Sequence, residues 1–405
     1  MKKNYFMLAA ATMMFAACAE TDLVNEVNVV SEPQAIGFET FANKATRAEP
    51  TAENSSANYS WDLSDHHKTF MVWGYKNTAT VKVFDAVTVS YDEGKTAWDY
   101  SDNSVSPVYW DKAATSYEFY AAAPATRNFW TLRTSTDDQD DDFFTTASFT
   151  IPSHNQATYQ DIDAPTQVIN NNEAIDLMIA AKNTFNKSIG EVPTAPVALN
   201  FIHILSRLNV TVKAAIEGVK VTNITIGNIN SQGTFNESPN NFDEAKLVDG
   251  TYSRWTLVED KEETRETGVD NDGTPIVETY TIPAPMVEYT NNTSKTLTKG
   301  EDAVIAIEAL VIPQLAGNES IPLNTTVFTN YKEPYIIINY TINNEPYRQV
   351  YNLAYAFNGD TSNDVAFNEG WQNTLNLTIN GEEITFTGKV ATWANGNVNN
   401  NPKIN

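Results

Sequence analysis

Short runs of alternating apolar and polar residues make up most of the chain after residue 50, and Gly, Asn, Asp and Pro interrupt them. Alternation with a period of two predicts β-strands with one buried face. The clearest runs are residues 69–75, 81–91, 117–120, 145–151, 219–229 and 303–312. No sustained helical period appears beyond the N-terminus. We therefore expect an all-β fold of tandem antiparallel β-sandwiches.

Pairs of these runs are expected to form hairpins. Asn380-Gly381 between two alternating runs is the strongest two-residue turn signal in the chain. The expected pairs are 105–110 with 117–120, 264–267 with 276–280, 335–342 with 347–353, and 375–379 with 384–386.

The N-terminus has the pattern of an export signal. Lys2 and Lys3 precede an apolar run at residues 5–17, which is too short to span a bilayer but fits a signal peptide. The run ends at Cys18, the only cysteine of the protein. This arrangement resembles a bacterial lipobox, in which the cysteine is lipidated and anchors the protein to a membrane. The alternative is an ordinary secretion signal with an incidental cysteine.

The remaining chain is expected to divide into a leader segment and two domains. Residues 1–17 are the signal peptide, and residues 18–47 are a polar segment that becomes strand-like near residue 35. The proline-punctuated stretch 190–196 is the best boundary candidate, so we expect domains at 48–196 and 197–405. The run that follows this boundary is apolar on both faces, which predicts a strand buried on both sides or bulged.

Composition and charge limit the kinds of molecule that the protein is expected to bind. The chain has 405 residues, 41% of them hydrophobic, and a net charge of −25. An acidic surface of this kind repels nucleic acid, so nucleic acid is not an expected partner. With one cysteine no internal disulfide forms.

No catalytic or cofactor constellation is evident. The adjacent His66 and His67 lack a third ligand at a suitable spacing, and His203 is expected to be a buried structural histidine. The acidic runs 137–142 and 270–273 lack the ligand spacing of a calcium loop, and the second is expected to be a hairpin turn. Phosphate loops, dinucleotide fingerprints and nucleophile elbows do not occur. We expect a non-enzyme without cofactor or metal.

Several runs, taken in order, resemble the fimbrillin family, the subunits of type V pili. They are Cys18; 36–38 followed by Thr46-Arg47-Ala48; 107–111 leading to 119–124; 201–207; 310–314; and 371–393. The resemblance implies two tandem transthyretin-like β-sandwiches and export as an outer-membrane lipoprotein precursor. It also implies that an arginine-specific protease cuts between Arg47 and Ala48 and removes a temporary strand near residues 35–41.

The same resemblance implies assembly by strand exchange with other pilus subunits. The groove left by the removed strand would accept a strand from the next subunit, giving a cell-surface fimbrium that supports adhesion to host or bacterial ligands. We expect the donor within residues 384–393, where Ile384, Phe386 and Val390 share one face. Residues 394–405 are rich in asparagine and suit a groove poorly, which leaves a tip or accessory role open.

Two further interpretations remain open from the sequence. A surface glycan-binding lipoprotein, or a tip adhesin, would use exposed aromatic residues such as Trp61, Trp98 and Trp130 to stack on sugars. Alternatively, residues 35–50 are a tether that ends in a loop.

Overall fold

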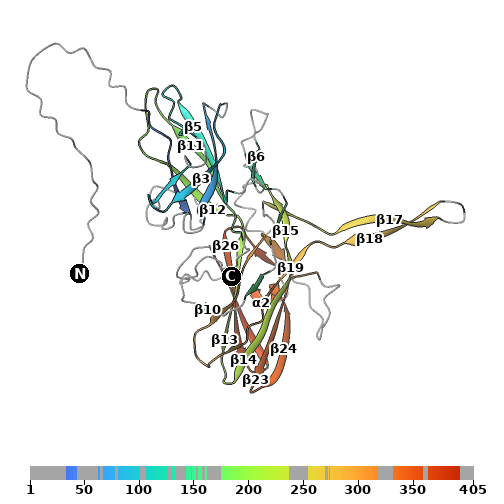
Figure 1. The fold of residues 1–405 in the computed structure, drawn as a ribbon. Helices are drawn as coiled ribbons and strands as arrows, with labels where there is room; N and C mark the ends of the chain where they lie inside the picture. The colour runs from blue at the N-terminus through green and yellow to red at the C-terminus, as the bar shows by residue number, and fades with distance from the viewer. Residues whose placement is uncertain are drawn as a thin grey trace, which may run out of the picture.

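A computed structural model describes the chain in segments (Figure 1). They are residues 33–42, 63, 67–77, 81–100, 106–125, 130–133, 143–146, 148–151, 154–156, 160–161, 175–236, 254–269, 272, 274–317, 332–358 and 364–392. β-Strands dominate this part, and α2 (Leu353–Asn358) is its single α-helix. The expected all-β class is confirmed. Within these segments no helix is both long and apolar enough to cross a membrane.

The first part of the chain forms one seven-stranded sheet. Its strands, in spatial order, are β1 (Phe38–Ala42), β12 (Val197–His203), β11 (Met178–Asn186), β5 (Ser116–Ala123), β2 (Thr69–Lys76), β3 (Val81–Asp92) and β4 (Ala97–Asp99). The sheet curls so that β1 and β4, at its two ends, contact each other. One face encloses an aromatic core, which we call the first core and which includes Phe70, Phe84 and Phe119.

The second part is a sandwich of two sheets around a larger core. One sheet has the order β10 (Gln160–Asp161), β21 (Val304–Val311), β13 (Ser206–Ala214), β26 (Trp371–Asn380) and β27 (Glu383–Thr392). The other has the order β24 (Glu345–Asn352), β23 (Tyr335–Ile342), β14 (Val219–Asn230), β19 (Met286–Asn291) and β9 (His154–Gln156), with β20 (Lys295–Thr296) beside β14. Both sheets supply buried residues to one cluster, for example Leu208 and Leu377 from the first, Ile226 and Ile338 from the second.

Smaller ladders complete the fold. They are β16 (Trp255–Leu257) with β15 (Gln232–Phe235) and β8 (Phe149–Thr150), β22 (Gln314–Ala316) with β25 (Val365–Phe367), β6 (Trp130–Arg133) with β7 (Phe143–Thr146), and β17 (Lys261–Val269) with β18 (Pro275–Ile282). The outer face of β2 and β5, which carries Met71, Trp73 and Tyr120, belongs to the larger core. The curled sheet and the sandwich are therefore joined by apolar packing.

Most of the expected hairpins are present. β23 and β24 pair through a turn at Asn343 and Asn344, which have φ of 53° and 74°. β26 and β27 pair across Asn380-Gly381, and Gly381 has φ of 78°. Asparagine and glycine tolerate this left-handed region better than other residues, which explains why both sequence signals were informative. β17 and β18 form the third expected hairpin.

The expected hairpin of residues 105–110 with 117–120 is wrong. β5 pairs with β2 on one side and β11 on the other, so no edge of it is left for residues 106–110. Tyr109 instead bridges to Ala35, near the N-terminus. Pro107 interrupts the run, and the Asp111 carboxylate accepts from the N–H of Ala113 and turns the chain before β5.

The expected domain boundary and strand direction also need correction. Residues 197–203, expected to open the second domain, form β12 and pair with β11 in the first sheet. The passage to the sandwich comes at residues 204–205, where the run that is apolar on both faces divides into two strands, β12 and β13.

The sheets are mixed and not purely antiparallel, because β1–β12, β13–β26 and β19–β9 are parallel pairs. Such pairs need long connections, and these strands lie far apart in sequence.

Candidate functional site

Residues 34–42 occupy a groove of the curled sheet and contact backbone on two sides. β1 runs parallel to β12, from Phe38 opposite Val197 to Ala42 opposite Phe201. Just before β1, the N–H of Ile36 donates to the carbonyl of Val108 at 2.8 Å, and the N–H of Trp110 donates to the carbonyl of Gln34 at 3.1 Å. The segment therefore closes the gap between the β12 edge and residues 106–110.

The side chains of this segment alternate between the core and solvent. Ile36, Phe38 and Thr40 are buried, with exposed fractions of 1%, 5% and 4%, whereas Glu39 is exposed. The Phe38 ring meets a cage of aromatic rings edge-on, at centroid distances of 5.3 to 6.1 Å. The cage residues are Phe70, Phe84, Tyr100 and Phe119. Burial of Ile36 and Phe38 contributes about 1.5–3 kcal/mol each.

Tyr100 links the segment to the loop beside it. Its hydroxyl donates to the carbonyl of Ile36 at 3.0 Å and accepts from the N–H of Val108 at 3.1 Å. Burial raises the pKa of Tyr100, which keeps the hydroxyl protonated as a donor. Tyr100 comes directly after β4, so the position of β4 decides where this hydroxyl lies.

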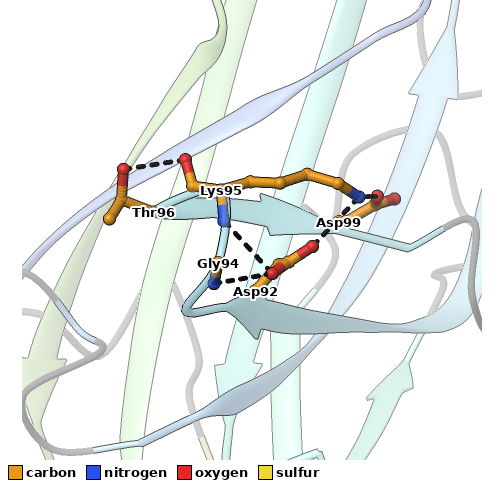
Figure 2. Close-up of polar contacts among 5 residues, drawn as sticks. All are labelled: Asp92, Gly94, Lys95, Thr96 and Asp99. Atoms are coloured by element: carbon orange, nitrogen blue, oxygen red, sulfur yellow. Dashed lines mark hydrogen bonds and ion pairs between the residues drawn. The ribbon is translucent and has the colours of Figure 1, made fainter.

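A tight turn between β3 and β4 fixes that position (Figure 2). The Asp92 carboxylate accepts from the N–H of Gly94 at 2.9 Å and of Lys95 at 3.2 Å. The Lys95 ammonium forms ion pairs with Asp92 at 3.0 Å and Asp99 at 3.1 Å, which lowers the pKa of Asp92. These contacts hold β4 against β3.

Residues 34–42 cover both the β12 edge and the Phe38 cage. Without residues 34–42, the N–H and C=O groups along one edge of β12 would lack partners, and the Phe38 cage would be open to water. An unpaired edge beside an apolar slot is a strong template for another strand.

The residues expected to govern lipidation and cleavage lie outside the described part of the chain. These are Cys18, Arg47 and Ala48. A strand is present where the temporary strand was expected: it is β1, which ends at Ala42, before the predicted cut, and its removal stays a prediction. Arg47 follows it by five positions in the sequence.

The expected donor strand is built into the sandwich. β27 pairs with β26 along ten residue pairs and is an edge strand of its sheet. Ile384 is buried, and the Phe386 ring packs edge-on against Tyr351 at 4.6 Å. Val390 lies opposite Asn373 in the ladder. Helix α2 covers the strand so closely that a Cβ at Gly388 would lie 2.5 Å from the Phe357 carbonyl oxygen.

The tryptophan platform of the alternative glycan-binding interpretation is not supported at Trp98 and Trp130. Trp98 belongs to the first core, where its ring meets Phe70 edge-on at 4.9 Å. Trp130 is 4% exposed, and its Nε1 donates to the Pro124 carbonyl at 2.9 Å. Both rings fill apolar space between strands and cannot stack on a glycan. Trp61 lies outside the described residues.

Two histidines, His67 and His203, both contact Asp176 near the passage between the two sheets. The buried His203 contacts the Asp176 carboxylate through Nδ1 at 2.9 Å, as expected for a structural histidine. His67 Nε2 lies 2.7 Å from the Asp176 carbonyl oxygen, and burial lowers the pKa of His67. His66 and the acidic run 137–142 are not described. Among described residues, no three or more His, Cys, Asp or Glu side chains gather to hold a metal.

Sequence reasoning found Ile36 and Phe38 but missed the residues that hold them. Phe84, Tyr100 and Phe119 are separate in sequence and meet only through the pairing of β2, β3, β4 and β5. The apolar run 106–110 was correctly predicted to need a partner strand, but the predicted partner was wrong. It pairs with residues 34–36 and forms the second side of the groove.

Comparisons with known proteins identify one family and several solved structures of low similarity. A family model described as Fimbrillin-like matches residues 46–393. A fimbrial protein from Bacteroides vulgatus is 14% identical, with a TM-score of 0.42 over 89% of this chain and 99% of its own. The C-terminally truncated tip fimbrial protein Mfa3 from Porphyromonas gingivalis is 11% identical, with a TM-score of 0.34 over 80% and 94%. No curated protein matches.

Proposed function

Because the chain belongs to the fimbrillin-like family, we propose that it is a structural subunit of a type V pilus that polymerises by exchange of β-strands. One observation carries this proposal. Residues 34–42 pair with the backbone of β12 and of residues 108–110, and they also bury Phe38 in an aromatic cage.

Removal of this segment would activate the subunit. The family match begins at residue 46, so β1 lies outside it, and Arg47 is the only arginine before Arg127. An arginine-specific protease that cuts between Arg47 and Ala48 would break the covalent link between β1 and the rest of the chain without cutting any other strand of the sheet. Keeping the groove filled until then prevents premature polymerisation.

A strand of the next subunit would replace β1. The candidate donor β27 contains Ile384-Thr385-Phe386, which repeats the spacing of Ile36-Gly37-Phe38. Phe386 would then enter the Phe38 cage, and Ile384 the site of Ile36. As an edge strand, β27 pairs with only one other strand, β26, so to leave the sandwich it must give up that ladder and its contacts with α2. Contacts from one end of a subunit to the other end of the next do not close on themselves and therefore build a filament.

Lipidation at Cys18 would hold the precursor at the outer membrane until the cut releases it into the surface fimbrium. The partners are then other pilus subunits, the protease, and surface ligands that the assembled fimbria reach.

Substitution of Arg47 tests this function. Arg47→Lys keeps the charge but removes the protease site, so we expect a lipidated, full-length monomer and no filaments by electron microscopy. Arg127→Lys, at the next arginine, is the matched control and should assemble normally. Normal filaments from Arg47→Lys would contradict the proposal.

A further inference from the structure

The ribbon of β17 and β18, which we call the arm, extends away from the rest of the protein (Figure 1). Within the described part of the chain these two strands pair only with each other. Every residue of β18 is exposed. Each strand therefore has an outer edge whose N–H and C=O groups are available to another strand.

The two outer edges differ in their protection against pairing. β17 has five charged residues among nine, and its ladder is bulged between Glu266 and Gly268. Charges and bulges are the features by which natural edge strands avoid pairing. β18 has one charged residue, Glu278, which forms an ion pair with Arg265 across the arm at 2.8 Å. β18 is therefore the edge open to a further strand.

β18 is also more apolar than an isolated ribbon needs to be. Ile276, Val277, Tyr280 and Ile282 have exposed fractions of 38% to 54%. A two-stranded ribbon alone in water is marginally stable. Apolar side chains that stay exposed on its two faces do not stabilise it, because they remain in contact with water. Addition of strands would shield these side chains and pair the open edge.

Two prolines define which part of β18 can pair. Pro275 and Pro283 lack a backbone N–H, which leaves residues 276–282 between them, centred on Thr279. Two copies of this stretch pair over their full length only when antiparallel, with Thr279 opposite Thr279. No charge then lies opposite a like charge. The opposed pairs are Ile276 with Ile282, Val277 with Thr281, and Glu278 with Tyr280.

We propose that the outer edge of β18 is a self-association site, at which two copies of this chain pair their arms about Thr279. The product is a four-stranded sheet with the two-fold symmetry of most homodimers, and the charged β17 strands at its outer edges prevent further growth. A second copy fits this edge because the stretch is complementary to itself. The site needs only the arm and is independent of strand exchange at the groove; in a filament, repeated arms would join neighbouring filaments with increased avidity.

Cysteine cross-linking tests the register. The full-length chain with Cys18→Ser has no other cysteine. Thr279→Cys in this background should give a disulfide-linked dimer on mild oxidation, because opposed Cα atoms about 4.5–5.5 Å apart suit a disulfide. Thr264→Cys is the matched control, since Thr264 is opposite Thr279 within the arm and equally on its surface. Equal cross-linking of the two variants would overturn the proposal.

Charge substitution tests the association itself, by sedimentation equilibrium of the full-length protein. Thr279→Lys places two lysines opposite each other and should abolish the dimer, whereas Thr264→Lys should retain it. A mixture of Thr279→Lys with Thr279→Glu should restore pairing. Association should also strengthen with salt, which screens the repulsion between two chains of charge −25. A wild-type monomer up to about 1 mM, or equal loss in both lysine variants, would overturn the proposal.

Discussion

The hydroxyl of Tyr100 donates to the backbone carbonyl of Ile36, 64 residues away in the sequence, at 3.0 Å. The same hydroxyl accepts from the N–H of Val108. One side chain of the curled sheet thus orients both the N-terminal segment and the loop that flanks it. Under the proposed strand exchange, Tyr100 would remain with the sheet, and its hydroxyl would donate to a carbonyl of the replacing strand.

Tyr100→Phe should loosen residues 34–42 while the cage keeps its shape. The ring remains, but the buried carbonyl of Ile36 loses a donor, which costs about 1–3 kcal/mol. Amide hydrogen exchange of residues 36–40 should quicken accordingly. Tyr91→Phe is the control, since Tyr91 packs by its ring against Trp98 at 5.2 Å. Unchanged exchange in Tyr100→Phe would show that its hydroxyl does not hold the segment.

Phe38→Ala should weaken the seat of β1 more strongly. Truncation of a buried phenylalanine costs about 3–5 kcal/mol, because apolar contact is lost and a cavity remains. Limited proteolysis within residues 33–42 should accelerate. Glu39→Ala, on the exposed face of the same strand, should change stability by less than about 0.5 kcal/mol. Similar protection of both variants would contradict the cage as the anchor of β1.

The sequence predicted three of the four expected hairpins and the inward residues of β1 because these depend on local chemistry. Alternation placed Ile36 and Phe38 on one face, and Asn380-Gly381 marked a turn that forms wherever its strands lie. The partner of β1 was not predictable in this way. The parallel alignment with β12 depends on tertiary packing between segments about 160 residues apart, as in the hydrogen bond from Gln34 to Thr194.

The boundary at residue 196 failed for a related reason. The proline-rich stretch 190–196 is a real break between strands, but it connects β11 and β12 of the same sheet. The chain passes from the curled sheet to the sandwich at Ile204 and Leu205. Both residues are buried where the two parts pack together, so this position carries apolar residues and not Gly or Pro. Turn residues mark changes of direction and not changes of sheet.

Acid should destabilise the passage between the sheets through His67. Burial lowers the pKa of His67 below 6.5 in the folded protein, so the unfolded chain binds the proton first as pH falls. The contribution of neutral His67 to the free energy of unfolding is therefore complete above about pH 6.5 and declines as the pH falls below that value. In urea titrations between pH 8 and 5, His67→Gln should show a smaller fall than wild type. An unchanged fall, matching the control Lys68→Gln, would exclude His67 as a source.

The buried ion pair of Arg207 and Glu308 should contribute far more to the free energy of unfolding than the exposed pair of Arg265 and Glu278 in the arm. Both side chains are 3% exposed, and burial lowers the pKa of Arg207 to about 10. Glu308→Gln removes the charge that directly contacts the buried guanidinium and should lower the free energy of unfolding by about 3–5 kcal/mol. Glu278→Gln breaks an exposed pair and should cost less than about 1 kcal/mol. Equal midpoints in denaturant would contradict this difference.

Sequencing of the N-terminus of subunits in purified surface filaments tests the central claim most directly. If the groove is opened by removal of β1, every assembled chain should begin at Ala48, and no peptide from residues 33–42 should remain. Filaments whose subunits begin at Cys18 and retain Phe38 would contradict the account, because the groove would then still hold its own strand.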